Sequence, residues 1–158
     1  MGIAAFIMTV QDIRVLRGKQ TEVPSWCIVL FFAGTVSVAL TFLVTALFLG
    51  QLFGYGFLYL GANFWFHLII PLYAAAECVF LVRERKLTVR DCGYAIVPMI
   101  LYSVYYIGMI LKYGLEDPRT DWYYFCIGGI RTLPFVLAVI YLVTFSIALG
   151  LRKAVNRK

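Results

Sequence analysis

The stretch WCIVLFFAGTVSVALTFLVTALFL, from Trp26 to Leu49, contains no charged residue and decides the fold class. About 20 apolar residues, each rising ~1.5 Å along a helix, cross the ~30 Å hydrocarbon core of a bilayer. A helix of a water-soluble protein normally keeps a polar face opposite its apolar stripe, and this stretch has no such face. The stretch therefore predicts a transmembrane helix.

Three further stretches have a similar length and apolar character. They run from Ala62 to Val82, from Gly93 to Leu111 and from Leu133 to Gly150. Only short connections separate these stretches along the chain. Together with the first, they predict an all-α, multi-pass transmembrane helical bundle with four full spans.

The composition of the 158 residues agrees with this class. Hydrophobic residues make up 63% and charged residues 14%, against about 45–50% and about 25% in typical soluble domains. These values exclude a soluble globular enzyme, a disordered tail and a nucleic-acid-binding domain. The chain shows no solenoid repeat, low-complexity tract or linker, so residues 1–158 are expected to form a single transmembrane domain.

The N-terminal segment is apolar from Met1 to Val10, after which Gln11 and Asp12 follow. About ten apolar residues are too few to span a bilayer. Basic residues follow this run instead of preceding it, which is not the order of a signal peptide. A short N-terminal helix is predicted, resembling the inner half of a membrane helix; a helix lying in the membrane interface is the alternative.

Most of the 14 basic residues lie on alternate connections between the spans. The positive-inside rule places these connections and the C-terminus in the cytoplasm. It also accounts for the net charge of +6 without a nucleic-acid partner. The basic residues on this side are Arg14, Arg17, Lys19, Arg83, Arg85, Lys86, Arg90, Arg152, Lys153, Arg157 and Lys158.

The 4 cysteines form no CxxC pair and no cluster with histidine. A disulfide framework and a zinc site are therefore not expected. No motif indicates a metal ion or another cofactor. The thiols are expected to be small apolar core groups.

His67 is the only histidine, and it lies about six residues inside the second span, ~9 Å from the outer end. Polar groups at this depth usually face the bundle interior or a cavity. Asn63 lies one turn earlier on the same face. Pro71 cannot donate a hydrogen bond to the carbonyl of His67 and is expected to kink the helix. The sequence predicts a polar pocket here, with a histidine bonded to a neighbouring helix as the alternative.

Residues of the other spans reach the same depth when counted from the outer ends. A threonine hydroxyl becomes a nucleophile beside a base, and neutral histidine is the usual base. The catalytic candidates are His67, Thr45 and Thr41, and the binding candidates are Asn63, Tyr102, Tyr105, Tyr106 and Arg131. The alternative for the two threonines is a close-packing stripe that also contains Gly34 and Ser37.

Glu77 is the one carboxylate within a predicted span. A charge at the middle of a membrane helix costs ~2.5–3.5 kcal/mol on insertion scales. Glu77 is expected to reach the inner interface or to pair with Arg83 or Arg85, with a proton relay as the alternative.

The stretch Asn63-Phe-Trp-Phe-His67-Leu-Ile-Ile-Pro71-Leu resembles the family of androgen-induced and androgen-dependent membrane proteins. The basic loop and the Tyr-rich helix with Pro98 that follow are similar to the C-terminal part of that family. Residues 34–45 and the start Met-Gly-Ile-Ala-Ala resemble its bacterial branch, which implies a bacterial plasma membrane protein.

The resemblance implies a six-helix membrane fold and hydrolysis of fatty acid esters of hydroxy fatty acids by a membrane-embedded threonine and histidine. His67 matches the family histidine. The family threonine has no matching position, and Thr9, Thr41 and Thr45 are possible substitutes. The chain resembles a family member that lacks the first helix and part of the second.

The leading hypothesis is an integral membrane protein resembling lipid-ester hydrolases, with His67 as the base and the activity either retained or lost. Membrane lipids are the expected partners, with a fatty-acyl ligand. The alternative is a non-catalytic lipid-binding or structural membrane protein, or a transporter component. The sequence leaves the oligomeric state open.

Overall fold

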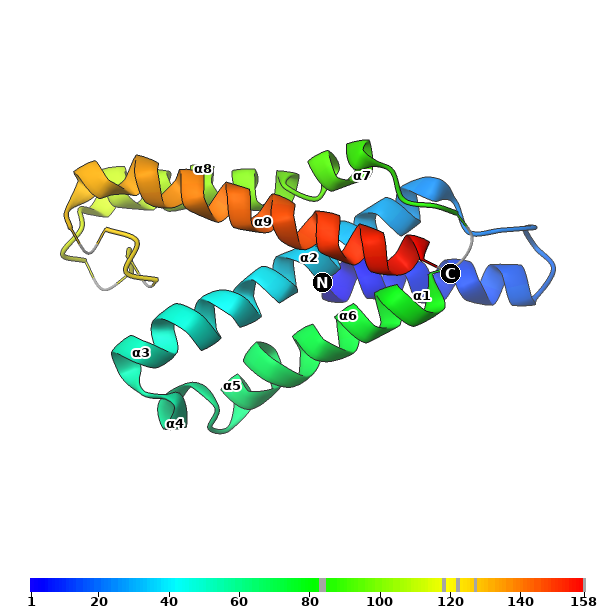
Figure 1. The fold of residues 1–158 in the computed structure, drawn as a ribbon, viewed down its shortest axis with the longest axis horizontal. Helices are drawn as coiled ribbons and strands as arrows, with labels where there is room; N and C mark the ends of the chain where they lie inside the picture. Colours follow the sequence, from blue (N-terminus) through cyan, green and yellow to red (C-terminus); the bar gives the residue numbers. More distant parts are fainter. Residues whose placement is uncertain (83–84, 118, 122, 127, 158) are drawn as a thin grey trace.

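The computed structural model describes residues 1–82, 85–117, 119–121, 123–126 and 128–157. All regular structure within these residues is helical (Figure 1). Four helical segments are long and apolar enough to cross a membrane, and they run Ser25–Phe53, Ala62–Phe80, Val89–Tyr113 and Ile130–Asn156. The predicted all-α bundle with four spans and a short N-terminal helix is confirmed.

Several of the spans are built from more than one helical segment. The first comprises α2 (Ser25–Val44), the π-helical η1 (Thr45–Leu49) and α3 (Gly50–Phe53). The second comprises α5 (Ala62–Phe64), the π-helical η2 (Trp65–Ile69) and α6 (Ile70–Leu81). The others are α7 (Val89–Tyr94) with α8 (Val97–Tyr113), and the 3₁₀ turn η3 (Ile130–Thr132) with α9 (Leu133–Asn156). Outside the spans lie α1 (Gly2–Leu16) and α4 (Tyr55–Leu58).

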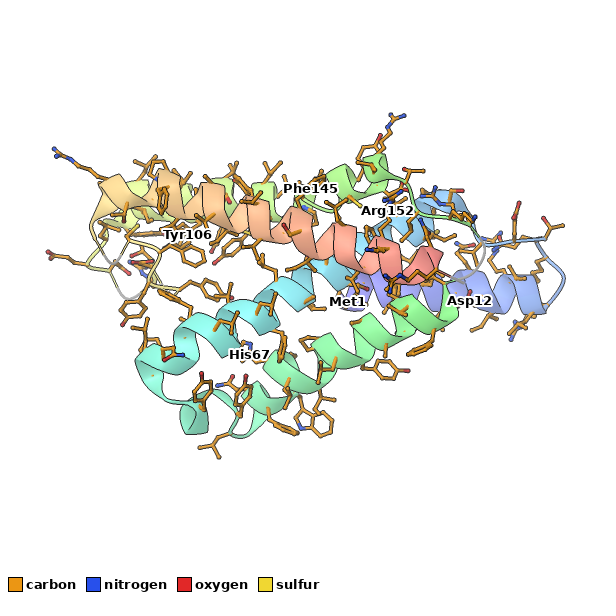
Figure 2. All side chains as sticks on the ribbon, in the orientation of Figure 1. Met1, Asp12, His67, Tyr106, Phe145 and Arg152 are labelled. Carbon is orange, nitrogen blue, oxygen red and sulfur yellow. The ribbon has the colours of Figure 1, made fainter. Side chains whose placement is uncertain are left out.

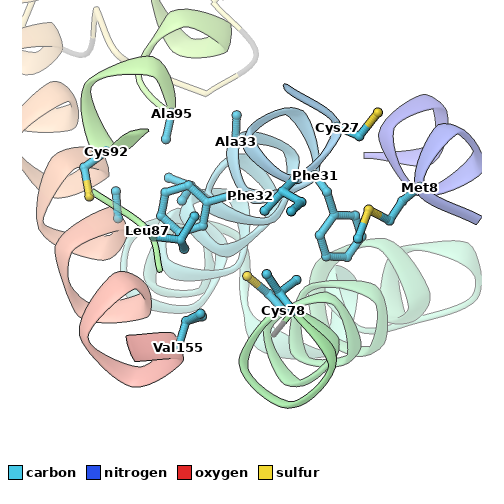
Figure 3. Close-up of a cluster of buried hydrophobic side chains, with 14 of the residues drawn as sticks. Met8, Cys27, Phe31, Phe32, Ala33, Cys78, Leu87, Cys92, Ala95 and Val155 are labelled. Carbon is cyan, nitrogen blue, oxygen red and sulfur yellow. The ribbon is translucent and has the colours of Figure 1, made fainter. Parts of the chain in front are cut away.

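Helix α2 is the centre of the bundle, since α1, α6, α8 and α9 all pack against it. Its residues Phe31 and Phe32 are buried in a cluster with Cys78 of α6, Cys92 of α7 and the loop residue Leu87 (Figure 3). The outer helices instead expose large apolar side chains. A water-soluble monomer rarely shows such continuous apolar surface, and these faces are those that contact lipid.

Helix α1 runs to Leu16, beyond the apolar segment that ends at Val10. It lies alongside the inner part of α2 (Figure 1), with Ala4 and Met8 buried. A Cβ added to Gly34, in the middle of α2, would contact Met1. The predicted short N-terminal helix is therefore present, and it packs against the first span.

The third span begins at Val89, before the predicted Gly93, because a capping box precedes it. Thr88 Oγ1 accepts a hydrogen bond from Asp91 N at 3.2 Å, and Asp91 Oδ2 accepts one from Thr88 N at 2.7 Å. Two free N–H groups of the first turn are thereby satisfied. The polar residues at this position therefore belong to the helix.

The inner loop is fastened to the end of α9 through the backbone of Leu87. Asn156 Nδ2 donates to Leu87 O at 2.8 Å, and Leu87 N donates to Asn156 Oδ1 at 2.9 Å. Arg85 pairs with Asp91 at 2.8 Å. Of the alternatives expected for Glu77, the pairing with Arg85 is not found, because the guanidinium of Arg85 pairs with Asp91. Arg83 lies outside the described residues.

Toward the outer end, the first and second spans diverge from α8 and α9 (Figure 1). The outer loop between α8 and α9 folds back toward the bundle, where Phe125 and Cys126 are buried against Tyr106 and Leu133. The outer half of α2 thus has two different surroundings. One face is turned to the second span, and the other is turned to α8, α9 and the outer loop.

Candidate functional site

Thr45 and His67 meet between the first two spans. Thr45 Oγ1 lies 3.4 Å from His67 Nδ1. Thr45 is fully buried, whereas His67 is half-buried and keeps part of its surface accessible. Thr45 is thus a neighbour of His67, as predicted. A histidine bonded to a neighbouring helix was the alternative to a polar pocket, and the hollows described below do not include His67.

Both residues lie in π-helical turns, Thr45 in η1 and His67 in η2. The turn η2 has a local cause, because Pro71 cannot donate a hydrogen bond to the carbonyl of His67. The sequence predicts a kink at this proline, and the structure has a π-helical turn there. Such π turns occur often at functional sites, where they change the direction of a side chain.

The hydroxyl of Thr45 differs from the other threonine hydroxyls of the spans. Thr35, Thr41 and Thr144 each donate to the carbonyl four residues earlier, at 2.7 to 3.1 Å. Thr45 faces the imidazole instead. Of the two catalytic threonines predicted from the sequence, the structure brings Thr45 to His67 and does not bring Thr41 there.

The contact is long for a hydrogen bond but within the range of catalytic pairs without substrate. When the imidazole carries its proton on Nε2, Nδ1 accepts the hydroxyl proton of Thr45. No carboxylate among the described residues hydrogen-bonds to the imidazole. Asn63 lies one turn before His67 and is half-buried, and its amide has no side-chain hydrogen bond within the described part of the chain.

The predicted tyrosines do not surround His67. Tyr106 is buried and donates to Asp121, whose oxygens also accept from Phe125 N at 2.7 Å and Cys126 N at 3.1 Å. Figure 2 shows Tyr106 well separated from His67. Asp121 was not predicted, because a loop that folds back onto a helix leaves no periodic pattern in the sequence.

The other two tyrosines have different positions. Tyr105 is 60% exposed. Tyr102 forms an edge contact with Tyr123 of the outer loop, with ring centroids 6.0 Å apart. Burial raises the pKa of the Tyr123 phenol, which therefore stays protonated at neutral pH. The tyrosines form an aromatic cluster beside the outer loop and contribute nothing to the Thr45–His67 pair.

Two hollows lie on the face of α2 that is turned to α8 and α9. A cavity of about 200 Å³ is lined by hydroxyl-bearing residues, among them Ser37, Thr41, Tyr102 and Tyr123. A groove of about 400 Å³ between α2 and α9 is almost entirely apolar. Thr41 thus belongs to a cavity that does not include His67.

Arg131 is exposed in η3 and lines neither hollow. It is not brought to the other predicted residues, because η3 turns it to the outer surface. Among the described residues, no group of histidine, cysteine, aspartate or glutamate is arranged to hold a metal ion.

Of the predicted site residues, the structure thus brings Thr45 and His67 into contact at 3.4 Å, and Asn63 lies one turn before His67. The sequence does not predict three further residues of this region, Asp121, Tyr123 and Thr144. Asp121 and Tyr123 lie in a loop without a periodic pattern, and Thr144 is one of many hydroxyl-bearing residues on apolar helices. No protein-family model, curated protein or solved structure matches the chain.

Proposed function

We propose that this protein is a membrane-embedded lipid-ester hydrolase in which Thr45 is the nucleophile and His67 the general base. The observation that carries the proposal is the 3.4 Å approach of Thr45 Oγ1 to His67 Nδ1. A threonine hydroxyl is a weak nucleophile until a neighbouring base removes its proton. The resemblance of residues 63–72 to the androgen-induced family, with its threonine and histidine, supports the same chemistry.

The reaction proceeds through an acyl-enzyme. Thr45 Oγ1 attacks the ester carbonyl carbon while His67 Nδ1 takes the hydroxyl proton, which gives a tetrahedral oxyanion. The intermediate expels the alcohol oxygen, which takes the proton from His67. Water then attacks the acyl-threonine with His67 again as base, and this step releases the fatty acid and restores Thr45.

Access to the pair is from the side of His67, because Thr45 itself is fully buried. The neighbouring Trp65 and Phe66 are exposed on the same segment, so a lipid approaching through the bilayer meets η2 first. The depth of His67, ~9 Å from the outer end of the span, suits an ester group that lies just below the lipid headgroups. We assign the side-chain amide of Asn63, which lies one turn nearer to the outer end, as the donor to the oxyanion.

The test is hydrolysis of p-nitrophenyl esters by the purified protein in mixed micelles. Long-chain esters are expected to be cleaved faster than p-nitrophenyl acetate, because the pair is reached through an apolar surface.

We also propose that the site opens to the extracytoplasmic leaflet and that the C-terminus is cytoplasmic, as in a bacterial plasma membrane protein. The support is the accumulation of basic residues at the opposite end of the spans. In intact cells, a Lys112→Cys variant is expected to react with a membrane-impermeant maleimide, and a Lys153→Cys variant only after permeabilisation.

These two positions are a matched pair, since both lysines are exposed near the ends of spans. The native protein is the background control, because its four cysteines are buried and burial raises the pKa of Cys126, which lies in the outer loop. Labelling of Lys153→Cys in intact cells would reverse the proposed orientation.

A second candidate function is lipid binding without catalysis. The groove of about 400 Å³ between α2 and α9 favours it, because that groove is apolar and does not include the Thr45–His67 pair. Purified protein that retains co-purified lipid and shows no esterase activity would support this candidate over hydrolysis.

A further inference from the structure

The cavity of about 200 Å³ extends from the middle of the membrane-spanning region to the outer loop, which contributes Tyr123 and Phe125 to the lining. Ser37 and Thr41 lie on either side of the middle of the first span, Tyr102 is next to the middle of the third, and Thr144 is next to the middle of the fourth. Polar side chains at this depth are costly and usually serve a function. This cavity is distinct from the Thr45–His67 pair, which lies nearer to the outer end.

Two tyrosines that line the cavity have no hydrogen-bond acceptor among the described residues. The hydroxyl groups of Ser37, Thr41 and Thr144 each donate a hydrogen bond to a backbone carbonyl, at 2.7 to 3.1 Å. Tyr102 and Tyr123 line the same cavity, and neither hydroxyl has a hydrogen-bond partner among the described residues. The cavity therefore offers two donors to a ligand and needs acceptor oxygens in return.

The residues that line the cavity also favour an uncharged, ring-shaped ligand. None of the lining residues is charged, so a charged ligand would lose its hydration without gaining a counter-ion. A cavity of about 150 Å³ in another protein holds benzene, and the volume here is thus sufficient for one six-membered ring. The rings of Tyr102, Tyr123 and Phe125 form its aromatic wall.

The cavity adjoins the groove between α2 and α9. Both are lined by Leu40, Val44, Phe125 and Ile140, and the groove continues along Leu47 and Val136. A ligand with its ring in the cavity can therefore place an apolar chain in the groove.

We propose that this cavity and groove bind the oxidised form of a prenyl quinone, with the ring carbonyls accepting hydrogen bonds from Tyr102 and Tyr123 and the prenyl chain in the groove. A quinone is uncharged, its polar atoms are acceptors, and its ring enters the middle of the bilayer. A glycerolipid also carries acceptor oxygens, but it has no ring to place against the aromatic wall.

The test is titration of the full-length protein in detergent with decylubiquinone, which has a short chain and is soluble enough for calorimetry. The double variant Tyr102→Phe/Tyr123→Phe keeps both rings and removes both donors, so its Kd is expected to rise about tenfold or more. Tyr73→Phe is the matched control, because Tyr73 is 68% exposed on α6 and its phenol lies outside the cavity.

A second variant, Ser37→Leu, fills the cavity and is expected to abolish binding while leaving the protein folded by its thermal transition. His67→Ala is expected to bind the quinone as tightly as the wild type, so this proposal and the hydrolase proposal can fail separately. Equal affinity of the wild type and the double variant would overturn the quinone site. Displacement of the quinone by an equal concentration of diacylglycerol would also overturn it.

Discussion

Replacement of His67 by alanine is expected to reduce hydrolysis of a long-chain ester by about 10²–10⁴-fold, the usual contribution of a positioned general base. Thr45→Val is expected to reduce the rate at least as much, because the nucleophile itself is lost. The cause in both cases is the same 3.4 Å contact. The double variant is expected to be no slower than Thr45→Val alone, since the two residues act as a unit.

Thr35→Val is the control for these substitutions. Thr35 is a fully buried threonine of α2, as Thr45 is of η1, but it donates to Phe31 O at 3.0 Å and does not face the imidazole. The rate should therefore be close to that of the wild type. Unchanged hydrolysis by the His67→Ala protein, or equal losses in Thr35→Val and Thr45→Val, would remove the pair from the mechanism.

Asp121→Ala is expected to give the largest loss of stability, about 2–4 kcal/mol, because hydrogen bonds to a charged acceptor contribute more than neutral ones. The substitution leaves the Tyr106 hydroxyl and the Phe125 and Cys126 N–H groups without their acceptor. The bond from Tyr106 joins the outer loop to α8, and the two backbone bonds fix the conformation of the loop itself. The thermal transition in detergent should fall by roughly 5–10 °C.

Asp117→Ala is the matched control within the same loop. Asp117 pairs with Arg119 at 2.8 Å, and this guanidinium lowers the pKa of the carboxyl to about 2. Surface pairs of this kind contribute little to stability because water screens them. Tyr106→Phe should show a partial loss. Equal transitions for the two aspartate variants would mean that Asp121 does not hold the loop.

The spans were predictable because each is a long apolar stretch, and for such a stretch in lipid a helix is the structure that satisfies the backbone. The ends were less predictable. The third span starts earlier than its apolar residues do, because Thr88 and Asp91 cap it. The signature Thr-Val-Arg-Asp was present in the sequence, but hydropathy alone assigns these polar residues to a loop.

The site was predicted in part, and the reasons are local. The sequence indicates both His67 and Thr45 as site residues. Uniform helical spacing cannot tell which of Thr45 and Thr41 lies beside His67, since the two threonines are one turn apart. The π turns at η1 and η2 break that spacing and decide which hydroxyl meets the imidazole. The positions of Tyr102 and Tyr106 depend on the outer loop, whose fold has no sequence period.

The central claim is that Thr45 becomes a nucleophile beside His67, and covalent capture tests it most directly. An alkyl fluorophosphonate should phosphonylate Thr45 Oγ1, with a new P–O bond, loss of fluoride and transfer of the proton to His67. Peptide mass mapping of the treated protein should place one adduct on Thr45 and none in the His67→Ala variant. An adduct on another residue, or an unmodified Thr45 in folded protein, would contradict the claim.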